Sequence, residues 1–110
     1  MVGRVGMFAV LLGVGLFAQG PTASTQKDYW SALAASSQKM HSAMGSVRPS
    51  GDSDADFVRL MLPHHQAAID MAKTQLLYGK DPQMRRLAQE IITDQQSEID
   101  LMRLWLKEHK

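Results

Sequence analysis

Residues 53–75 read SDADFVRLMLPHHQAAIDMAKTQ, and this stretch decides the fold of the chain. Ser53 followed by Asp56 forms an S-x-x-D pattern, in which a hydroxyl and a carboxylate satisfy the free amides at a helix start. The pattern predicts a helix that begins near Asp54 and runs to Tyr78. At 100° per residue, its apolar and donor side chains fall on two neighbouring strips, which we expect to form one wide buried face. The strips are Phe57, Met61, His64, Ala68, Met71 and Gln75, and Val58, Leu62, His65, Ile69, Ala72 and Leu76.

Two further helices are predicted beside this one, over residues 27–45 and from 82 to about 107. Gly79 ends the central helix, and Asp81 followed by proline gives the last helix an N-cap and a favourable first turn. Pro63 cannot donate to the carbonyl four residues before it, so we expect a kink just before the two histidines. The serines of the first stretch leave open the alternative that it is only partly ordered.

No strand-like alternation and no internal repeat interrupts these helical patterns. The fold class is therefore predicted as all-α, an up-and-down three-helix bundle with short connections. About 85 residues remain after the N-terminal stretch described next, and a chain of that size buries only a small core. Pairing with a second copy would complete a larger bundle, so we expect a homodimer as one form of the protein.

The N-terminus has the three parts of a signal peptide. Arg4 is followed by an apolar run from Val5 to Ala18 and then by small residues. The run is shorter than the stretch of about 20 apolar residues that spans a bilayer, so we predict cleavage between Ala18 and Thr25. Residues 1–24 are then signal peptide and lead-in, and residues 25–110 form one domain in the periplasm or outside the cell. The alternative is a retained N-terminal anchor.

Composition excludes several classes of partner. The chain has no cysteine, so disulfides and thiolate metal sites are ruled out. It has 12 Lys and Arg against 11 Asp and Glu, and removal of Arg4 leaves 11 of each. A neutral chain without a basic patch gives no support for nucleic acid binding, and we expect no membrane contact once the signal peptide is removed.

Methionine and histidine recur at the predicted inner positions of all three helices. Thioethers are soft ligands that favour Cu(I), and by the same reasoning Ag(I), while imidazole suits copper in either oxidation state. Structural zinc sites use more Cys and His, calcium and magnesium want clustered oxygens, and di-iron bundles need Glu-x-x-His pairs that this chain lacks. The candidate ligands are Met40, His41, Met44, Met61, His64, His65, Met71 and Met102.

A plainer interpretation stands beside each of these residues. A methionine stripe at helical spacing is more often core packing than coordination, which is our expectation for Met84. Gln95 and Glu98 border the apolar stripe of the last helix. They can orient an imidazole through its second nitrogen or supply oxygen ligands. Otherwise Gln95 is an ordinary buried hydrogen-bonding group and Glu98 a surface charge.

The motif Met61-x-x-His64-His65-x-x-Ala68-x-x-Met71, followed by Gln95-x-x-Glu98-Ile99-x-x-Met102, resembles the family catalogued as domain of unknown function 305. The resemblance covers about residues 54–106. It implies a ferritin-like helical bundle, usually exported from bacteria, with some members associated with copper binding and copper resistance. Carried over to this chain, the motif falls on Met61, His64, His65, Met71, Gln95, Glu98 and Met102.

We therefore expect an exported copper-binding protein that holds Cu(I) through Met and His on facing helices, for sequestration, trafficking or tolerance. Its partners would be the copper ion and a protein that donates or accepts it. The single copy of the motif argues against high-capacity storage. The alternative is a metal-free helical interaction or dimerisation module, in which the same stripe is core or partner surface. No nucleophile and base arrangement is visible, so we do not expect an enzyme.

Overall fold

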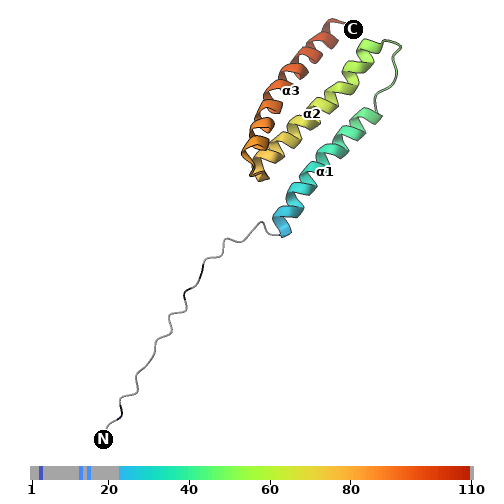
Figure 1. The fold of residues 1–110 in the computed structure, drawn as a ribbon. Helices are drawn as coiled ribbons and strands as arrows, with labels where there is room; N and C mark the ends of the chain where they lie inside the picture. The colour runs from blue at the N-terminus through green and yellow to red at the C-terminus, as the bar shows by residue number, and fades with distance from the viewer. Residues whose placement is uncertain (1–2, 4–12, 14, 16–22, 110) are drawn as a thin grey trace.

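The structure is a computed structural model that describes residues 23–109 together with Gly3, Gly13 and Gly15, with side chains placed from Asp28 onward. Three helices make up this part of the chain, and it contains no strand: α1 (Ala23–Gly45), α2 (Ser53–Tyr78) and α3 (Pro82–Glu108). The prediction of an all-α three-helix fold is confirmed (Figure 1). No helix within residues 23–109 is long and apolar enough to cross a bilayer. The predicted signal peptide lies outside the described residues.

Helix α1 ends at Gly45 as predicted and is ordered along the stretch that contains the serines. It begins at Ala23, four residues before the predicted start at Lys27, because alanine and glutamine in its first turn are good helix formers. The loop to α2 turns at Gly51, whose φ of 91° lies in the left-handed region that favours glycine.

The cap of α2 differs from the prediction. Asp52, and not Ser53, is the N-cap residue, and its carboxylate accepts hydrogen bonds from the amides of Asp54 and Ala55. Asp56 turns back to the loop, where the hydroxyl of Ser50 donates to it at 2.7 Å and the amide of Ser50 at 3.0 Å. These bonds, with help from Arg59, lower the pKa of Asp56 below its ordinary value of 3.8. An aspartate one residue earlier competes successfully with serine for the cap position.

The turn between α2 and α3 forms at the residues that were predicted to end one helix and to begin the next. The amide of Gly79 donates to the carbonyl oxygen of Gln75 at 2.7 Å, and the carboxylate of Asp81 accepts from the amide of Met84 at 3.0 Å. The guanidinium of Arg85 adds a second tie by donating to the carbonyl oxygens of Leu76 and Gly79. The two helices therefore leave this turn as an antiparallel pair.

The helices form a layer with α2 in the middle. Helix α2 packs against both α1 and α3, whereas the backbones of α1 and α3 do not come close to each other within the described residues, although side chains of both line one cleft over α2. Figure 1 shows the same order across the layer, with α2 between its two neighbours. Each helix therefore touches only those next to it in sequence, and both broad sides of α2 are left partly uncovered.

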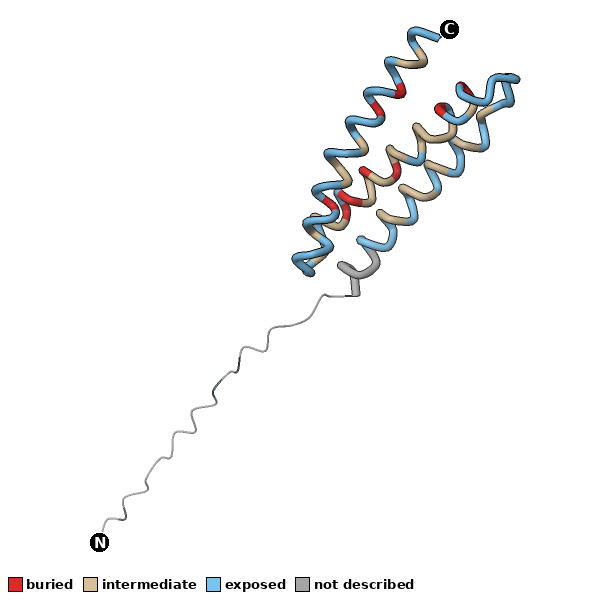
Figure 2. The backbone as a smooth tube through the Cα atoms, turned by 45° about the horizontal axis from the view of Figure 1, so that its top comes forward, coloured by how far each residue is buried: buried red, intermediate tan, exposed pale blue. Residues whose placement is uncertain are grey.

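The core lies between α2 and α3. It consists of Val58 and Ile69 from α2 and Ile99 and Met102 from α3, and Ile99 is the most completely buried at 1% exposed. Figure 2 shows the buried segments on α2 and α3, while the described side chains of α1 are half-buried or exposed. Half-buried side chains extend this core: Met61, Leu62, Ile92, Trp105 and Leu106.

Only one of the two predicted strips of α2 forms the core. The strip that contains Val58, Ile69 and Ala72 is buried against α3. The other strip was expected to be buried but is only half-buried or exposed: Phe57 is 61% exposed and His64 is exposed, because no helix covers this side of the layer. We call this side, centred on Phe57, His64 and Met71 of α2, the open face.

Trp30 of α1 is 66% exposed, since α1 contacts only one neighbour and most of its surface faces away from it. Helix α2 runs through Pro63 as one helical element. The kink at this proline stays a prediction.

Candidate functional site

His65 connects α2 to α3 through both of its ring nitrogens. Its Nδ1 atom lies 2.9 Å from the carbonyl oxygen of Met61, one turn earlier on α2. Its Nε2 atom lies 2.5 Å from Oε2 of Glu98 on α3. The imidazole is mostly buried, with 17% of its side chain exposed, while 56% of the Glu98 side chain is exposed. The carboxylate therefore covers the imidazole from the solvent side.

The two contacts engage both nitrogens of the imidazole. A carbonyl oxygen only accepts, so Nδ1 of His65 donates to Met61. The carboxylate of Glu98 occupies the position in front of Nε2. In this arrangement neither nitrogen of His65 is directed at an open position for a metal ion.

Two thioethers lie beside this pair at the contact between α2 and α3. Met102 is 8% exposed and belongs to the core cluster, and Met61 packs against the same cluster. The structure thus brings Met61, His65, Glu98 and Met102 to one region. Gln95 is half-buried on the inner side of α3, one turn before Glu98.

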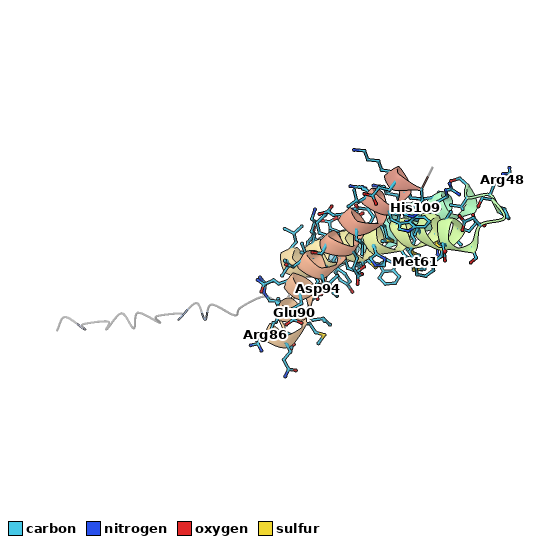
Figure 3. The ribbon with its side chains drawn as sticks, turned by 90° about the horizontal axis from the view of Figure 1, so that it is seen from above. Arg48, Met61, Arg86, Glu90, Asp94 and His109 are labelled. Carbon is cyan, nitrogen blue, oxygen red and sulfur yellow. The ribbon has the colours of Figure 1, made fainter. Side chains whose placement is uncertain are left out.

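His64 and Met71 point away from that region, onto the open face of α2. His64 is exposed and Met71 half-buried. Seven residues separate them, which is about 10 Å along a helix. Met61 precedes His64 by three residues, so its thioether can reach the same face from the α3 side. Figure 3 shows Met61 on α2 among the side chains of the helical layer.

Helix α1 supplies further candidate metal ligands, and its alignment with α2 decides which of them lie near the ligands of α2. Met40 lines a cleft of about 230 Å³ together with Pro63 and Gln66 of α2, so these positions are level along the two antiparallel helices. His41 follows Met40 by one residue and Met44 follows it by about one turn. Because the two helices are antiparallel, His41 is level with His64 and Met44 is level with Met61.

The side of α1 on which each donor lies follows from the same cleft. Ser36, Lys39, Met40 and Ala43 line the cleft, which opens on the side of the layer opposite the open face. His41 is rotated by 100° from Met40 and lies on the open-face side, and half-buried Met44 lies between the two directions. Met40 is thus separated from the other donors, which the sequence pattern did not reveal.

Residues that could hold a hard metal ion do not gather in this fold. Within residues 23–109, no three His, Asp or Glu side chains converge on one point. His109 stacks on Trp105 with ring centroids 4.3 Å apart and its Nδ1 atom 2.8 Å from the Trp105 carbonyl oxygen. The i, i+4 spacing of these two residues was the available signal for that contact.

A second groove lies on the open face between α2 and α3. It has a volume of about 320 Å³ and is lined by apolar side chains with one carboxylate at its end. Phe57 and Leu101, which flank it, are 61% and 66% exposed. The lining residues are Asp54, Phe57, Val58, Leu101, Met102 and Trp105.

Fold and site together define a small all-α domain with one open face that carries imidazole and thioether side chains. The chain belongs to the family described as Domain of unknown function (DUF305), which matches residues 18–106. The match confirms the family predicted from the motif. It also reaches beyond the predicted span of 54–106 to include α1, so His41 and Met44 lie within the family region.

The chain also resembles part of a viral protein. Uncharacterized protein L153 of Acanthamoeba polyphaga mimivirus is 42% identical to this chain over 57 residues. Those residues make up 52% of this chain and 38% of the viral protein. The similarity therefore concerns about half of this chain and a smaller part of its relative.

Proposed function

We propose that this protein binds Cu(I) as cargo on its open face, for copper sequestration, trafficking or tolerance. The observation that supports the proposal is the alignment of α1 with α2, which makes His41 and Met44 level with His64 and Met61. His41, Met44 and His64 then lie at one level of the contact between α1 and α2. The thioether of Met61, which packs against the α2–α3 core, can reach this level from the α3 side. Hydrophobic packing alone does not require imidazoles at these positions.

The donor chemistry favours Cu(I) over other ions. Thioethers are soft ligands that select the reduced ion, and imidazole binds copper in either oxidation state. Silver(I) has the same preference, while Cu(II) would use the imidazoles more than the sulfurs. Zinc and calcium fit poorly, since the described residues bring no three His, Asp or Glu side chains together.

The exposure of the ligands suits an ion that is exchanged. His41 and His64 are both exposed, so an ion can reach them from solvent or from a donor protein without unfolding the layer. The expected export of the chain would place this exchange in the periplasm or outside the cell. Transfer to an acceptor protein would use the same open face.

In this proposal His65 positions the site and does not bind the ion. Its bonds to the Met61 carbonyl and to Glu98 hold the turn of α2 from which Met61 and His64 project. Outer groups of this kind fix the orientation of metal ligands in many proteins. Met71, about 10 Å further along α2, would serve a second ion or the route by which copper arrives.

The proposal is tested by titrating the chain from Ala23 to Lys110 with Cu(I) held by a competing chelator, without oxygen. We expect one tightly held ion in the unaltered protein. The double variant His41→Ala/His64→Ala should lose it, and Met44→Leu/Met61→Leu should weaken it while keeping apolar side chains of similar volume. His109→Ala is the matched control, because it removes a histidine at the C-terminal end of α3, away from the contact between α1 and α2. Failure to compete with even a weak chelator would refute copper binding.

A metal-free interaction module is the second candidate function. The exposed Phe57 and Leu101 on the open face favour it, because isolated surface apolar residues are normal but a groove flanked by two of them marks a binding surface. It would be favoured if the titration showed no copper binding and the protein formed a complex through this face.

A further inference from the structure

The open face has the size and the side chains of a protein interface. Domains are usually built from at least two packed layers, whereas the described residues form one layer with a core on one side of α2. Large apolar side chains that remain exposed occur on all three helices. Those on the open face are Trp30 of α1, Phe57 of α2, and Leu87 and Leu101 of α3.

We propose that a second copy of this chain covers the open face, with a twofold axis parallel to α2. Each α2 then lies against α2 of the partner, and each α1 lies against α3 of the partner. The result is a two-layer, six-helix dimer. The inference does not depend on copper and applies to the metal-free protein.

The area of the face supports a stable dimer. Helix α2 has 26 residues and is about 39 Å long. With neighbouring helices about 9 Å apart, three of them present a face of roughly 1,000 Å². Stable complexes bury about 800 Å² on each partner. One face of the layer is therefore large enough.

The alignment of the helices makes the face complementary to itself. Helices α1 and α3 run in the same direction, and both are antiparallel to α2. His41 is level with His64, and Glu98 contacts the neighbouring His65, so His41 of one copy faces Glu98 of the other. An imidazole and a carboxylate are thereby brought together across the interface.

The apolar side chains match in the same arrangement. Tyr29 packs on Tyr78 with ring centroids 6.5 Å apart, and Arg85 bonds the carbonyl oxygen of Leu76. Trp30 is therefore level with the first turns of α3 and faces Leu87 of the partner. Phe57 lies on the middle helix and faces Phe57 of the partner near the twofold axis, which buries two side chains that are exposed in one chain alone.

Two open faces can also be stacked by a second kind of twofold axis, but the charges of α3 favour the axis parallel to α2. A twofold axis perpendicular to the helices would place α3 antiparallel to α3 of the partner. If that axis crosses α3 at Asp94, near the middle of the helix, it brings Glu90 close to Glu98 and Asp94 close to its own copy, and like charges at an interface oppose association. Figure 3 shows Glu90 and Asp94 on successive turns of α3.

Cysteine cross-linking of the full chain tests the inference, because the sequence contains no cysteine of its own. The variant Phe57→Cys should form a disulfide-linked dimer under mild oxidation in the presence of a metal chelator. Leu77→Cys is the matched control: it is also an exposed apolar residue of α2, at 78% exposed, but lies on the opposite side of the layer. We expect it to cross-link at least about tenfold more slowly. A mixture of Trp30→Cys and Leu87→Cys chains should form mixed dimers.

Sedimentation of the unaltered chain gives a second measurement that does not need cysteine. We expect a dimer that dissociates on dilution, and Phe57→Asp should shift it to monomer with its helicity unchanged. A monomer at every concentration, or equal cross-linking of Phe57→Cys and Leu77→Cys, would overturn the inference. A monomer that still binds copper would overturn the dimer alone, and a dimer without copper binding would overturn the copper proposal alone.

Discussion

Glu98 of α3 and His65 of α2 share one short hydrogen bond, 2.5 Å between Oε2 and Nε2, while the other nitrogen of the same imidazole bonds the carbonyl oxygen of Met61. One side chain thus ties the backbone of α2 to the side chain of α3. Both residues belong to the motif by which the family was predicted. Their contact gives that motif a structural role that holds with or without a metal ion.

Removing the carboxylate should weaken the connection between α2 and α3. We expect Glu98→Ala to lower the free energy of unfolding by about 0.5 to 1 kcal/mol, a modest value because more than half of the Glu98 side chain is in solvent. Glu98→Gln should lose less stability, since the side-chain amide can still form a hydrogen bond with Nε2 of His65. Urea unfolding of the three proteins makes the comparison. Equal stability of all three would show that the contact contributes nothing.

The cap of α2 can be tested by two neighbouring substitutions. Asp52→Ala should destabilise the protein by about 1 kcal/mol, because it removes the acceptor for the amides of Asp54 and Ala55. Ser53→Ala should be nearly neutral, since Ser53 lies inside the helix. Thermal unfolding followed by circular dichroism measures both. A larger loss for Ser53→Ala would favour the cap predicted from the sequence.

Asp56 makes the stability depend on acid pH. Its hydrogen bonds from Ser50 lower its pKa in the folded state below the ordinary value of 3.8. The folded protein therefore holds this proton less tightly than the unfolded chain, and the stabilisation is complete above that value. It is lost as the pH falls through the lower folded pKa. Ser50→Ala should reduce this loss in unfolding experiments between neutral pH and pH 2, and an unchanged profile would contradict it.

Ile99 should be the most sensitive position of the core. It is 1% exposed and packs with residues of both α2 and α3, so Ile99→Ala would leave a cavity and lower the free energy of unfolding by about 2 to 5 kcal/mol. Ile99→Val should lose about 1 kcal/mol. Leu101→Ala is the control on the same helix, because it removes a side chain that is 66% exposed. A comparable loss at both positions would show that the core has been misplaced.

If both proposals hold, dimerisation covers the copper ligands. His64 and Phe57 lie on the same face of α2, so a dimer locked by a disulfide at position 57 should take up Cu(I) at least about tenfold more slowly than the reduced form. Stopped-flow mixing with a coloured Cu(I) complex measures the rates. The Leu77→Cys chain serves as the control for the oxidising treatment. Equal rates in the locked and reduced forms would place the copper site elsewhere.

The helices themselves could be predicted closely from sequence, because their signals are local. Gly45, Gly79 and the Asp81-Pro82 pair mark ends that the structure confirms. The cap of α2 was misplaced by one residue because Asp52 and Ser53 are both good cap residues, and the choice depends on the loop in which Ser50 engages Asp56.

The side of α2 that becomes the core could not be predicted, because helical periodicity identifies strips but not neighbours. Phe57 and Val58 begin two neighbouring, mostly apolar strips, and only the position of α3 decides between them. The same limit applies to the donors. Met40 and His41 are adjacent in sequence, yet only the packing of α1 on α2 shows that Met40 lines the cleft while His41, 100° around the helix, lies towards the open face.

The contact of each helix only with its neighbours in sequence has a consequence for how the chain acquires its structure. Few contacts join distant parts of the chain, so little loop entropy is lost before stabilising contacts form, and such topologies fold in microseconds to milliseconds. The α2–α3 hairpin, which holds Ile99 and the core, can form without α1. We expect α1 to join last and to exchange its amide hydrogens first, which would let the protein assemble or lose the α1 side of its open face without unfolding the rest.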